Sequence, residues 1–464
     1  MNRRRRAPML RGTRLLVWLF AGLLAACMSV DDAHTSATIK SLDDLSINTL
    51  RRRSYGSSMS IEAQPAHNDH DTFIASYRSD GLRVYSRIDV PASPVPEGGF
   101  PVVLFVHGWA GIEAAPASNF YLDDDSNYQA MIASYVAAGF VVFTPGWRGH
   151  GTVNGVPADG IEFMQAWDNG SYLSPVFFAI DVLNLLDSLS TFDNARLDLE
   201  NVNVVAHSQG GDVALLALAI AGEGSGVATG ISAASIWSGC FPSRFTQLET
   251  YAPMQRTPEA FLAGDGTWTG TPTSASGATN PNFVFGYPAD WIGTPHVEEW
   301  TWQRDTFSMP TVADVLDLKL GEMYGAINQY VGDIDDAEYE LRRSPGSKVE
   351  IVHDDRVRAA MSKIDAFFME QYLTEPLALQ HSDRDFYSFS EWNADLCARV
   401  NRAGGTCHDF EYAGNTHSLH ISENRWFSGD KAVPGFDTAI RRDIVLFSGD
   451  DPVRTGTSAE WPAK

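Results

Sequence analysis

The feature that most constrains the fold of this chain is a regular alternation of short apolar runs and helical segments. The runs "VVLFV", "VVF" and "VNVVA" are short and apolar throughout, and each ends in glycines or polar residues. Segments with helical spacing separate them, among them "YQAMIASYVAAGF" and "PVFFAIDVLNLLDSL". Short apolar strands that alternate with helices predict a mostly parallel sheet covered by helices on both faces, which is an α/β fold.

The alternation is interrupted once. It stops after Gly239 and resumes at "EPLALQHSDRD". Residues 240–372 begin with aromatic and Pro/Gly/Ser/Thr-rich stretches and continue with helical patterns such as "RVRAAMSKIDAFFMEQYL". We predict one catalytic domain formed by residues 71–239 and 373–464, with 240–372 as a large inserted cap. Near its start, the Asp80-Gly81 pair in "YRSDGLRVYS" predicts a β-hairpin.

The N-terminus has the pattern of an export signal. "MNRRRRAPMLRGTR" is basic, "LLVWLFAGLLAAC" is apolar, and "LAAC" resembles the lipobox of bacterial lipoproteins. In that family the cysteine, here Cys27, is lipidated and becomes the first residue. The resemblance implies a lipoprotein of the bacterial cell envelope that is anchored to a membrane without spanning it, and a plain cleaved signal with secretion is the alternative. Residues 28–70 lack periodicity, which predicts a flexible tether.

Charge and cysteine content narrow the partners and the compartment. The chain has 34 Lys and Arg and 58 Asp and Glu, which gives a net charge of −24. So negative a protein repels phosphate groups, which argues against binding to nucleic acid and, apart from the lipid anchor, to anionic lipid surfaces. Export implies an oxidising compartment, in which disulfides persist. Cys397 and Cys407 flank a Gly-Gly turn and are the candidate pair, which leaves Cys240 free and buried.

A candidate nucleophile lies in "NVNVVAHSQGGDVALLAL". Ser208 follows an apolar run and precedes a helical one, which predicts a tight strand-to-helix turn that exposes the hydroxyl. The N–H of Gln209 would then lie at a helix N-terminus and could stabilise an oxyanion. The usual pattern has glycine where Ala206 stands, but alanine is small enough for this crowded position.

Further chemical groups follow other predicted strands. "LFVHGWAG" supplies a loop from which the N–H of Trp109 would be the second oxyanion donor, with His107 in a structural role. "LQHSDRD" ends a strand with a polar turn that contains Asp383 and Asp385. "GNTHSL" brings His417 after the next strand, and the competing His420 is typical of a helix start.

These stretches together resemble the α/β-hydrolase superfamily, in particular the catalytic domains of the prolyl oligopeptidase and dienelactone hydrolase groups. The resemblance covers residues 73–239 and 375–448 and has the order nucleophile, acid, histidine. It implies that Ser208, Asp385 and His417 form a catalytic triad, since the family motif "His-Gly-x-x-Asp" aligns its acid with Asp385. Ser382 replaces the usual glycine of that motif.

The expected function is that of an exported serine hydrolase that cleaves a small or polymeric carboxylic ester without a metal or organic cofactor. The acidic stretch "HNDHD" (67–71) is expected to be a solvated loop and not a metal site, and "DIDDAEYE" (333–340) is expected to be an exposed acidic helix start. One alternative is a peptidase of the prolyl oligopeptidase type, although the stretch between Cys27 and the first predicted strand is too short to be expected to form the β-propeller of those peptidases. The other is a non-catalytic cell-surface binding module on a hydrolase scaffold.

Overall fold

A computed structural model gives the structure of the protein. It describes residues 41–67, 69–108, 128–161, 174–243, 245–246, 320–321, 323–325, 336–343, 349–382, 388–412, 419, 436–449 and 461. All of these residues belong to one compact unit. None of the helices in these ranges is long and apolar enough to span a lipid bilayer.

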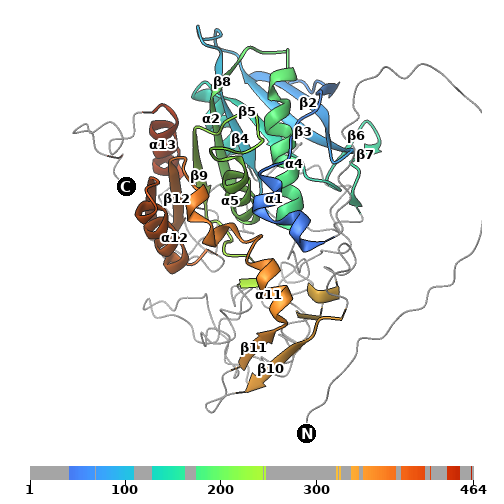
Figure 1. The fold of residues 1–464 in the computed structure, drawn as a ribbon. Coiled ribbons are helices and arrows are strands. Elements are labelled where there is room, and N and C mark those ends of the chain that lie inside the picture. The colour runs from blue at the N-terminus through green and yellow to red at the C-terminus, as the bar shows by residue number, and fades with distance from the viewer. Residues whose placement is uncertain are drawn as a thin grey trace, which may run out of the picture. The chain divides into compact units, whose positions relative to one another are not determined.

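The centre of the fold is a nine-stranded sheet with the order β1-β2-β3-β5-β4-β8-β9-β12-β13 (Figure 1). Its strands are β1 (Ser60–Ala63), β2 (His70–Ser79), β3 (Leu82–Pro91), β4 (Phe100–Val106), β5 (Val141–Pro145), β8 (Leu197–His207), β9 (Ala233–Trp237), β12 (Leu377–Ser382) and β13 (Cys407–Tyr412). Two short strands, β6 (Thr152–Val153) and β7 (Val156–Pro157), form a separate ribbon.

The sheet is mixed but mostly parallel. All pairings from β5 through β13 are parallel, whereas β1, β2 and β3 pair antiparallel with their neighbours. The expected hairpin is confirmed, because β2 and β3 are joined by Asp80 and Gly81, with φ angles of 51° and 81°. Two successive positive φ angles are typical of the type I′ turn that Asp-Gly favours.

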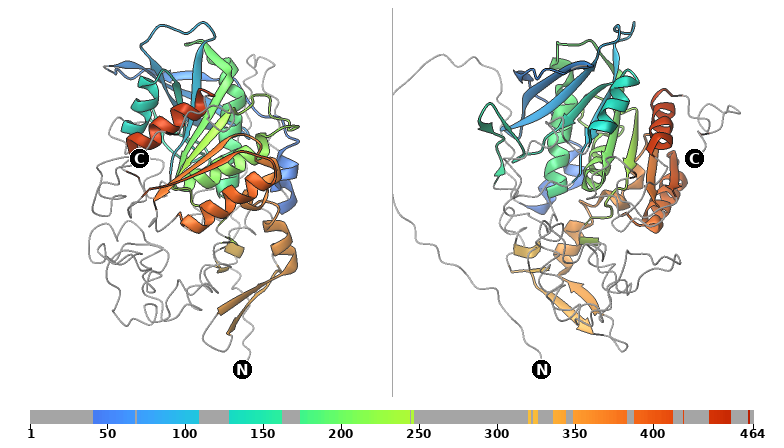
Figure 2. Two further views of the ribbon diagram at one scale, coloured as in Figure 1. Left: turned by 90° about the vertical axis from the view of Figure 1, so that its left-hand side faces the viewer. Right: turned by 180° about the vertical axis from the view of Figure 1, so that it is seen from behind.

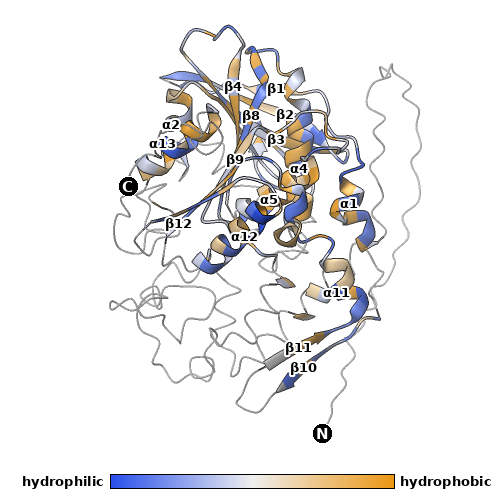
Figure 3. Ribbon diagram, turned by 60° about the vertical axis from the view of Figure 1, so that its left-hand side comes forward, coloured by the Kyte–Doolittle hydropathy of each residue, from blue (hydrophilic) through white to orange (hydrophobic). Residues whose placement is uncertain are grey.

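Helices cover both faces of the sheet, as the alternating pattern predicted (Figures 1 and 2). The helices over the sheet are α2 (Gln129–Ala137), α4 (Ser174–Ser188), α5 (Gln209–Ala221), α12 (Ser390–Arg402) and α13 (Phe436–Phe447). The short helix α1 (Ile47–Leu50) packs on α5, and α11 (Asp355–Met361) lies apart from the sheet. Buried side chains of α4, α5 and α12 form one apolar core with the sheet, and those of α2 and α13 form a second core on the other face. Figure 3 shows that most residues of α4 and α5 are hydrophobic, in keeping with the burial of these helices.

The expected tether at 28–70 needs correction, because its described part belongs to the folded domain. A 3-10 helix (Leu42–Leu45) and α1 bury four apolar side chains in the same core as α5. Further along the segment, β1 extends the sheet at its edge. The segment is polar overall, but its apolar residues recur at intervals of two or three positions. This spacing is sufficient for a short amphipathic turn to pack against a helix.

The expected insertion also differs from its sequence pattern where it is described. An acidic helix start was expected at 333–340, but β10 (Tyr339–Arg343) forms a hairpin with β11 (Val349–His353). The helix expected over 356–373 ends at Met361. Beyond it, the buried Asp365 caps a 3-10 turn and accepts hydrogen bonds from the hydroxyls of Ser243 and Thr246, each at 2.6 Å. A tertiary partner therefore overrides the local helical pattern.

Candidate active site

Ser208 lies on a tight turn between β8 and α5. Its backbone angles are φ 57° and ψ −126°, a conformation that is strained for a residue with a side chain. Three backbone hydrogen bonds hold Ser208 in this conformation. Its N–H donates to the carbonyl of Trp237 at 3.1 Å, and its carbonyl accepts the N–H groups of Gly211 at 2.8 Å and Cys240 at 3.0 Å. Gln209 is the first residue of α5, as the sequence predicts for an oxyanion donor.

The turn is crowded, and the residues after Ser208 must be small. A Cβ atom on Gly210 would lie 2.2 Å from the carbonyl oxygen of Val106, and one on Gly211 would lie 2.6 Å from the Cα of Gly239. The N-terminus of α5 therefore packs directly on the backbone that follows β4 and β9. Ala206, in place of the usual glycine, is fully buried in β8 between its neighbours on β4 and β9.

The loop that follows β4 passes next to Ser208. A Cβ atom on Gly108 would lie 3.1 Å from the Cβ of Ser208 and 2.5 Å from the Tyr128 hydroxyl. The N–H of Gly108 donates to that hydroxyl at 2.8 Å, and the hydroxyl is hydrogen-bonded to Nδ1 of His207 at 2.9 Å. These buried hydrogen bonds fix the start of the loop beside Ser208. Trp109, the expected second oxyanion donor, lies outside the described residues.

His107 has the surroundings of a structural residue. It is fully buried, its Nδ1 lies 2.7 Å from the carbonyl oxygen of Gly108, and its ring stacks on Trp147 with centroids 4.1 Å apart. Burial lowers the pKa of His107 to about 3, so its ring is neutral at physiological pH. A ring with so low a pKa is a weak general base, which agrees with the expected structural role.

Cys240 lies against Ser208, a contact that no pattern in the sequence predicts. Its Sγ is 3.5 Å from the Ser208 Oγ, and its side chain is buried. The contact joins residues that are far apart in the chain and meet because β8 and β9 are neighbours in the sheet. Cys240 is a free thiol, as expected.

The expected acid and base, Asp385 and His417, lie outside the described residues, as does Cys27. The strands that precede the first two are described. His207 pairs with Trp237, Trp237 with Gln380, and Ser382 with Tyr412, so β8, β9, β12 and β13 end at one edge of the sheet. In parallel sheets the loops at this edge form the binding site.

A buried polar network fixes the ends of these strands from the α13 face. The side-chain amide of Gln380 accepts the Tyr412 hydroxyl at 2.6 Å and donates to the Asp443 carboxyl at 2.5 Å. Asp443 also accepts the hydroxyl of Tyr135 and the indole N–H of Trp237. Burial raises the pKa of Asp443 to about 7 against the lowering effect of these donors. The network links β9, β12, β13, α2 and α13.

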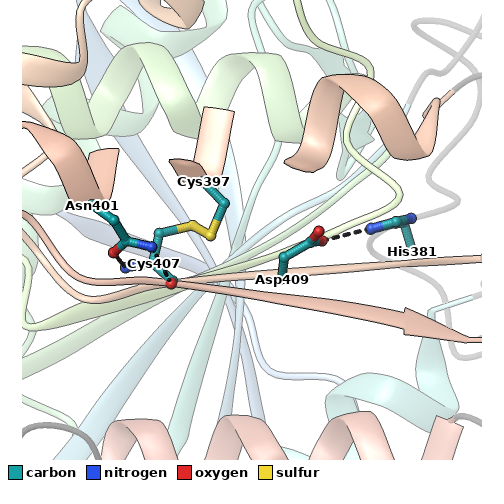
Figure 4. The surroundings of a disulfide bond; sticks show 5 residues. All are labelled: His381, Cys397, Asn401, Cys407 and Asp409. Carbon is teal, nitrogen blue, oxygen red and sulfur yellow. Dashed lines mark hydrogen bonds and ion pairs between the residues drawn. A yellow bond between two sulfur atoms is a disulfide. The ribbon is translucent and has the colours of Figure 1, made fainter. Parts of the chain in front are cut away.

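On the α12 face, two further interactions hold the last strands (Figure 4). A disulfide joins Cys397 of α12 to Cys407 of β13, the pair that their sequence spacing favoured. His381 Nε2 lies 2.7 Å from Asp409 Oδ1, which is an imidazole–carboxylate pair between β12 and β13 that sequence analysis did not single out. Within the described ranges, no three His, Cys, Asp or Glu side chains gather as a metal site would require.

Comparison with known proteins identifies the architecture. A family model described as the alpha/beta hydrolase fold matches residues 101–322, and no curated protein matches the sequence. With the mixed, mostly parallel nine-stranded sheet and its helical layers, the protein has the α/β-hydrolase fold.

Solved structures with some likeness include two esterases and a peptidase. Acetyl xylan esterase 1 from Thermoanaerobacterium sp. JW/SL YS485 is 12% identical with a TM-score of 0.46, over 89% of this chain and 96% of that one. Est1E from Butyrivibrio proteoclasticus with bound ferulic acid is 13% identical with a TM-score of 0.40, over 81% and 99%. Dipeptidyl peptidase 4 from Porphyromonas gingivalis is 12% identical with a TM-score of 0.43, over 82% and 36%. Likeness at this level does not bear on the activity or substrate of this chain.

Proposed function

We propose that this protein is a serine hydrolase that cleaves carboxylic esters with Ser208 as the nucleophile. The observation that carries the proposal is the strained turn at Ser208, whose φ of 57° is maintained by three backbone hydrogen bonds. Such strain costs about 1–3 kcal/mol and persists where the surrounding structure enforces it, above all at functional sites. A serine on a strand-to-helix turn of this fold is the arrangement that activates a nucleophile.

In the proposed mechanism, the Ser208 Oγ attacks the ester carbonyl carbon while His417 accepts its proton. Asp385 orients the imidazole and stabilises its protonated form. The N–H groups of Gln209 and Trp109 stabilise the oxyanion of the tetrahedral intermediate. His417 then protonates the departing alcohol, and water cleaves the acyl-enzyme by the same steps in reverse.

The test uses a fluorophosphonate probe, which reacts only with an activated serine. We expect the wild type to be labelled and Ser208→Ala to be unlabelled, with loss of p-nitrophenyl ester hydrolysis by a factor of about 10⁴ or more. His417→Ala should lose labelling while keeping its melting temperature. Labelling of Ser208→Ala, or none of the wild type, would contradict the proposal.

Labelling combined with a second substrate panel distinguishes an esterase from the two alternatives, a peptidase and a non-catalytic binding module. An aminoacyl p-nitroanilide panel, run beside p-nitrophenyl esters of graded chain length, would show a peptidase by turnover of the anilides in preference to the esters. A wild type that is neither labelled nor active but binds a cell-surface ligand would be a binding module.

We also propose that the N-terminal segment directs export and that Cys27 carries a lipid. The proposal is supported by the basic, apolar and "LAAC" pattern of residues 1–27 and by the Cys397–Cys407 disulfide, which suits an oxidising compartment.

A further inference from the structure

The thiol of Cys240 is in direct contact with the proposed nucleophile. Its Sγ lies 3.5 Å from the Ser208 Oγ, which is van der Waals or weak hydrogen-bond distance for sulfur and oxygen. Both side chains are almost fully buried, with 8% of Ser208 and 4% of Cys240 exposed. The thiol therefore fills space immediately beside the hydroxyl oxygen.

The backbone around Cys240 is fixed from both sides. Its own N–H donates to the carbonyl of Ser208 at 3.0 Å. The next side chain, Phe241, is fully buried and stacks on Phe367 with centroids 5.9 Å apart. Two residues on, the Ser243 hydroxyl donates to the buried carboxyl of Asp365. Because well-packed interiors resist displacement, the Cys240 side chain cannot easily move away from a bound substrate.

We propose that the Cys240 side chain limits the size of the acyl group that the enzyme accepts. This inference rests on the proposed function of Ser208. During the reaction the acyl carbonyl carbon becomes bonded to Oγ, so an atom in contact with Oγ in the free enzyme also contacts the acyl-enzyme. The alcohol departs when the acyl-enzyme forms, whereas the acyl group is next to Sγ through both half-reactions. Cys240 is thus a specificity-determining residue for the acyl part of the substrate.

The experiment changes the volume at position 240 and measures two selectivities. The acyl series compares p-nitrophenyl acetate, butyrate and hexanoate, and the alcohol series compares acetates of different phenols. Cys240→Ala should raise kcat/KM for butyrate relative to acetate by roughly tenfold, and Cys240→Val should lower the same ratio by a similar factor, since hydrophobic pockets discriminate by such factors per methylene. The alcohol series should keep its order in both variants.

Cys240→Ser is the matched control, because it replaces the thiol with a group of similar shape and should retain the acyl ratio of the wild type. Melting temperature and fluorophosphonate labelling establish that each variant is folded with a reactive Ser208. Acyl ratios that do not respond to Ala or Val in a labelled, active enzyme would overturn this inference alone, as would a change in the alcohol series in place of the acyl series. A wild type that is unlabelled and inactive would overturn the proposed function and this inference with it.

Discussion

At Asp443, burial and hydrogen bonding act in opposite directions on one carboxyl group. The hydroxyl of Tyr135, the indole of Trp237 and the amide of Gln380 all donate to it, which favours the charged form. Burial favours the neutral form and prevails, so the pKa rises from 3.8 to about 7. In the folded protein this group therefore binds a proton at pH values at which it has lost one in the unfolded chain.

This difference predicts how stability depends on pH. Between the unfolded and folded pKa of Asp443, the native state binds more protons, so the stability it contributes is fully present below about pH 4 and is lost as pH rises to about 7. We expect Asp443→Asn to remove that loss. The difference in free energy of unfolding between variant and wild type, from urea titrations between pH 4.5 and 8, should change by on the order of a few kcal/mol. A difference that is constant across this range would contradict the assignment.

The residues of the site differ in how far the sequence predicted them. The turn at Ser208 depends on neighbours in the chain, including Gly210 and Gly211, and was therefore expected. The contact between Cys240 and Ser208 and the pair formed by His381 and Asp409 depend on which strands are adjacent. A local pattern contains no information on that adjacency.

The 3-10 helix at Leu42–Leu45 and α1 were not predicted because the segment that contains them is mostly polar. Leu45 and Ile47 are fully buried in the same core as α5, although polar residues surround them in the chain. Leu45→Ala should lower the free energy of unfolding by about 2–5 kcal/mol, because it leaves a cavity in a packed core. Denaturant titration checks this, with substitution of the exposed Ile61 to alanine as the control that should cost far less. An unaltered stability for Leu45→Ala would mean that the segment is a tether after all.

Strand β10 was missed for a different reason. Its acidic residues suggested a solvated helix start, yet Tyr339 and Leu341 pack toward the core while Glu340 and Arg342 are exposed. This is the alternation of a strand with one buried face. The strand forms only when it pairs with β11. The stability that this pairing contributes cannot be predicted from the sequence of either segment alone.

At the scale of the whole molecule, the alternating pattern predicted the α/β architecture because it reflects burial on both faces of the sheet. The order of the strands was not predicted by periodicity, since any of them could have been neighbours in a buried sheet. Their observed order places the ends of β8, β9, β12 and β13 together.

The proposed lipid anchor at Cys27 is tested on the full chain in bacterial cells. In bacterial cells given radiolabelled palmitate, the wild type should incorporate label and pellet with membranes. Cys27→Ser should incorporate none and appear in the soluble fraction with its ester hydrolysis intact. Label in the Cys27→Ser protein would place the modification elsewhere, and no label in the wild type would favour a plain cleaved signal.

The pairing of β9 with β12 has a consequence for how the chain acquires its fold. Trp237 ends β9 and Leu377 begins β12, so these two neighbours in the sheet are separated by residues 238–376 of the chain. Closing so long a loop costs entropy before the pairing repays it, and such non-local contacts slow folding. The last two strands are also made last. Until these strands have been synthesised, β9 presents an unpaired apolar edge, so the growing chain is prone to aggregation until its synthesis is nearly complete.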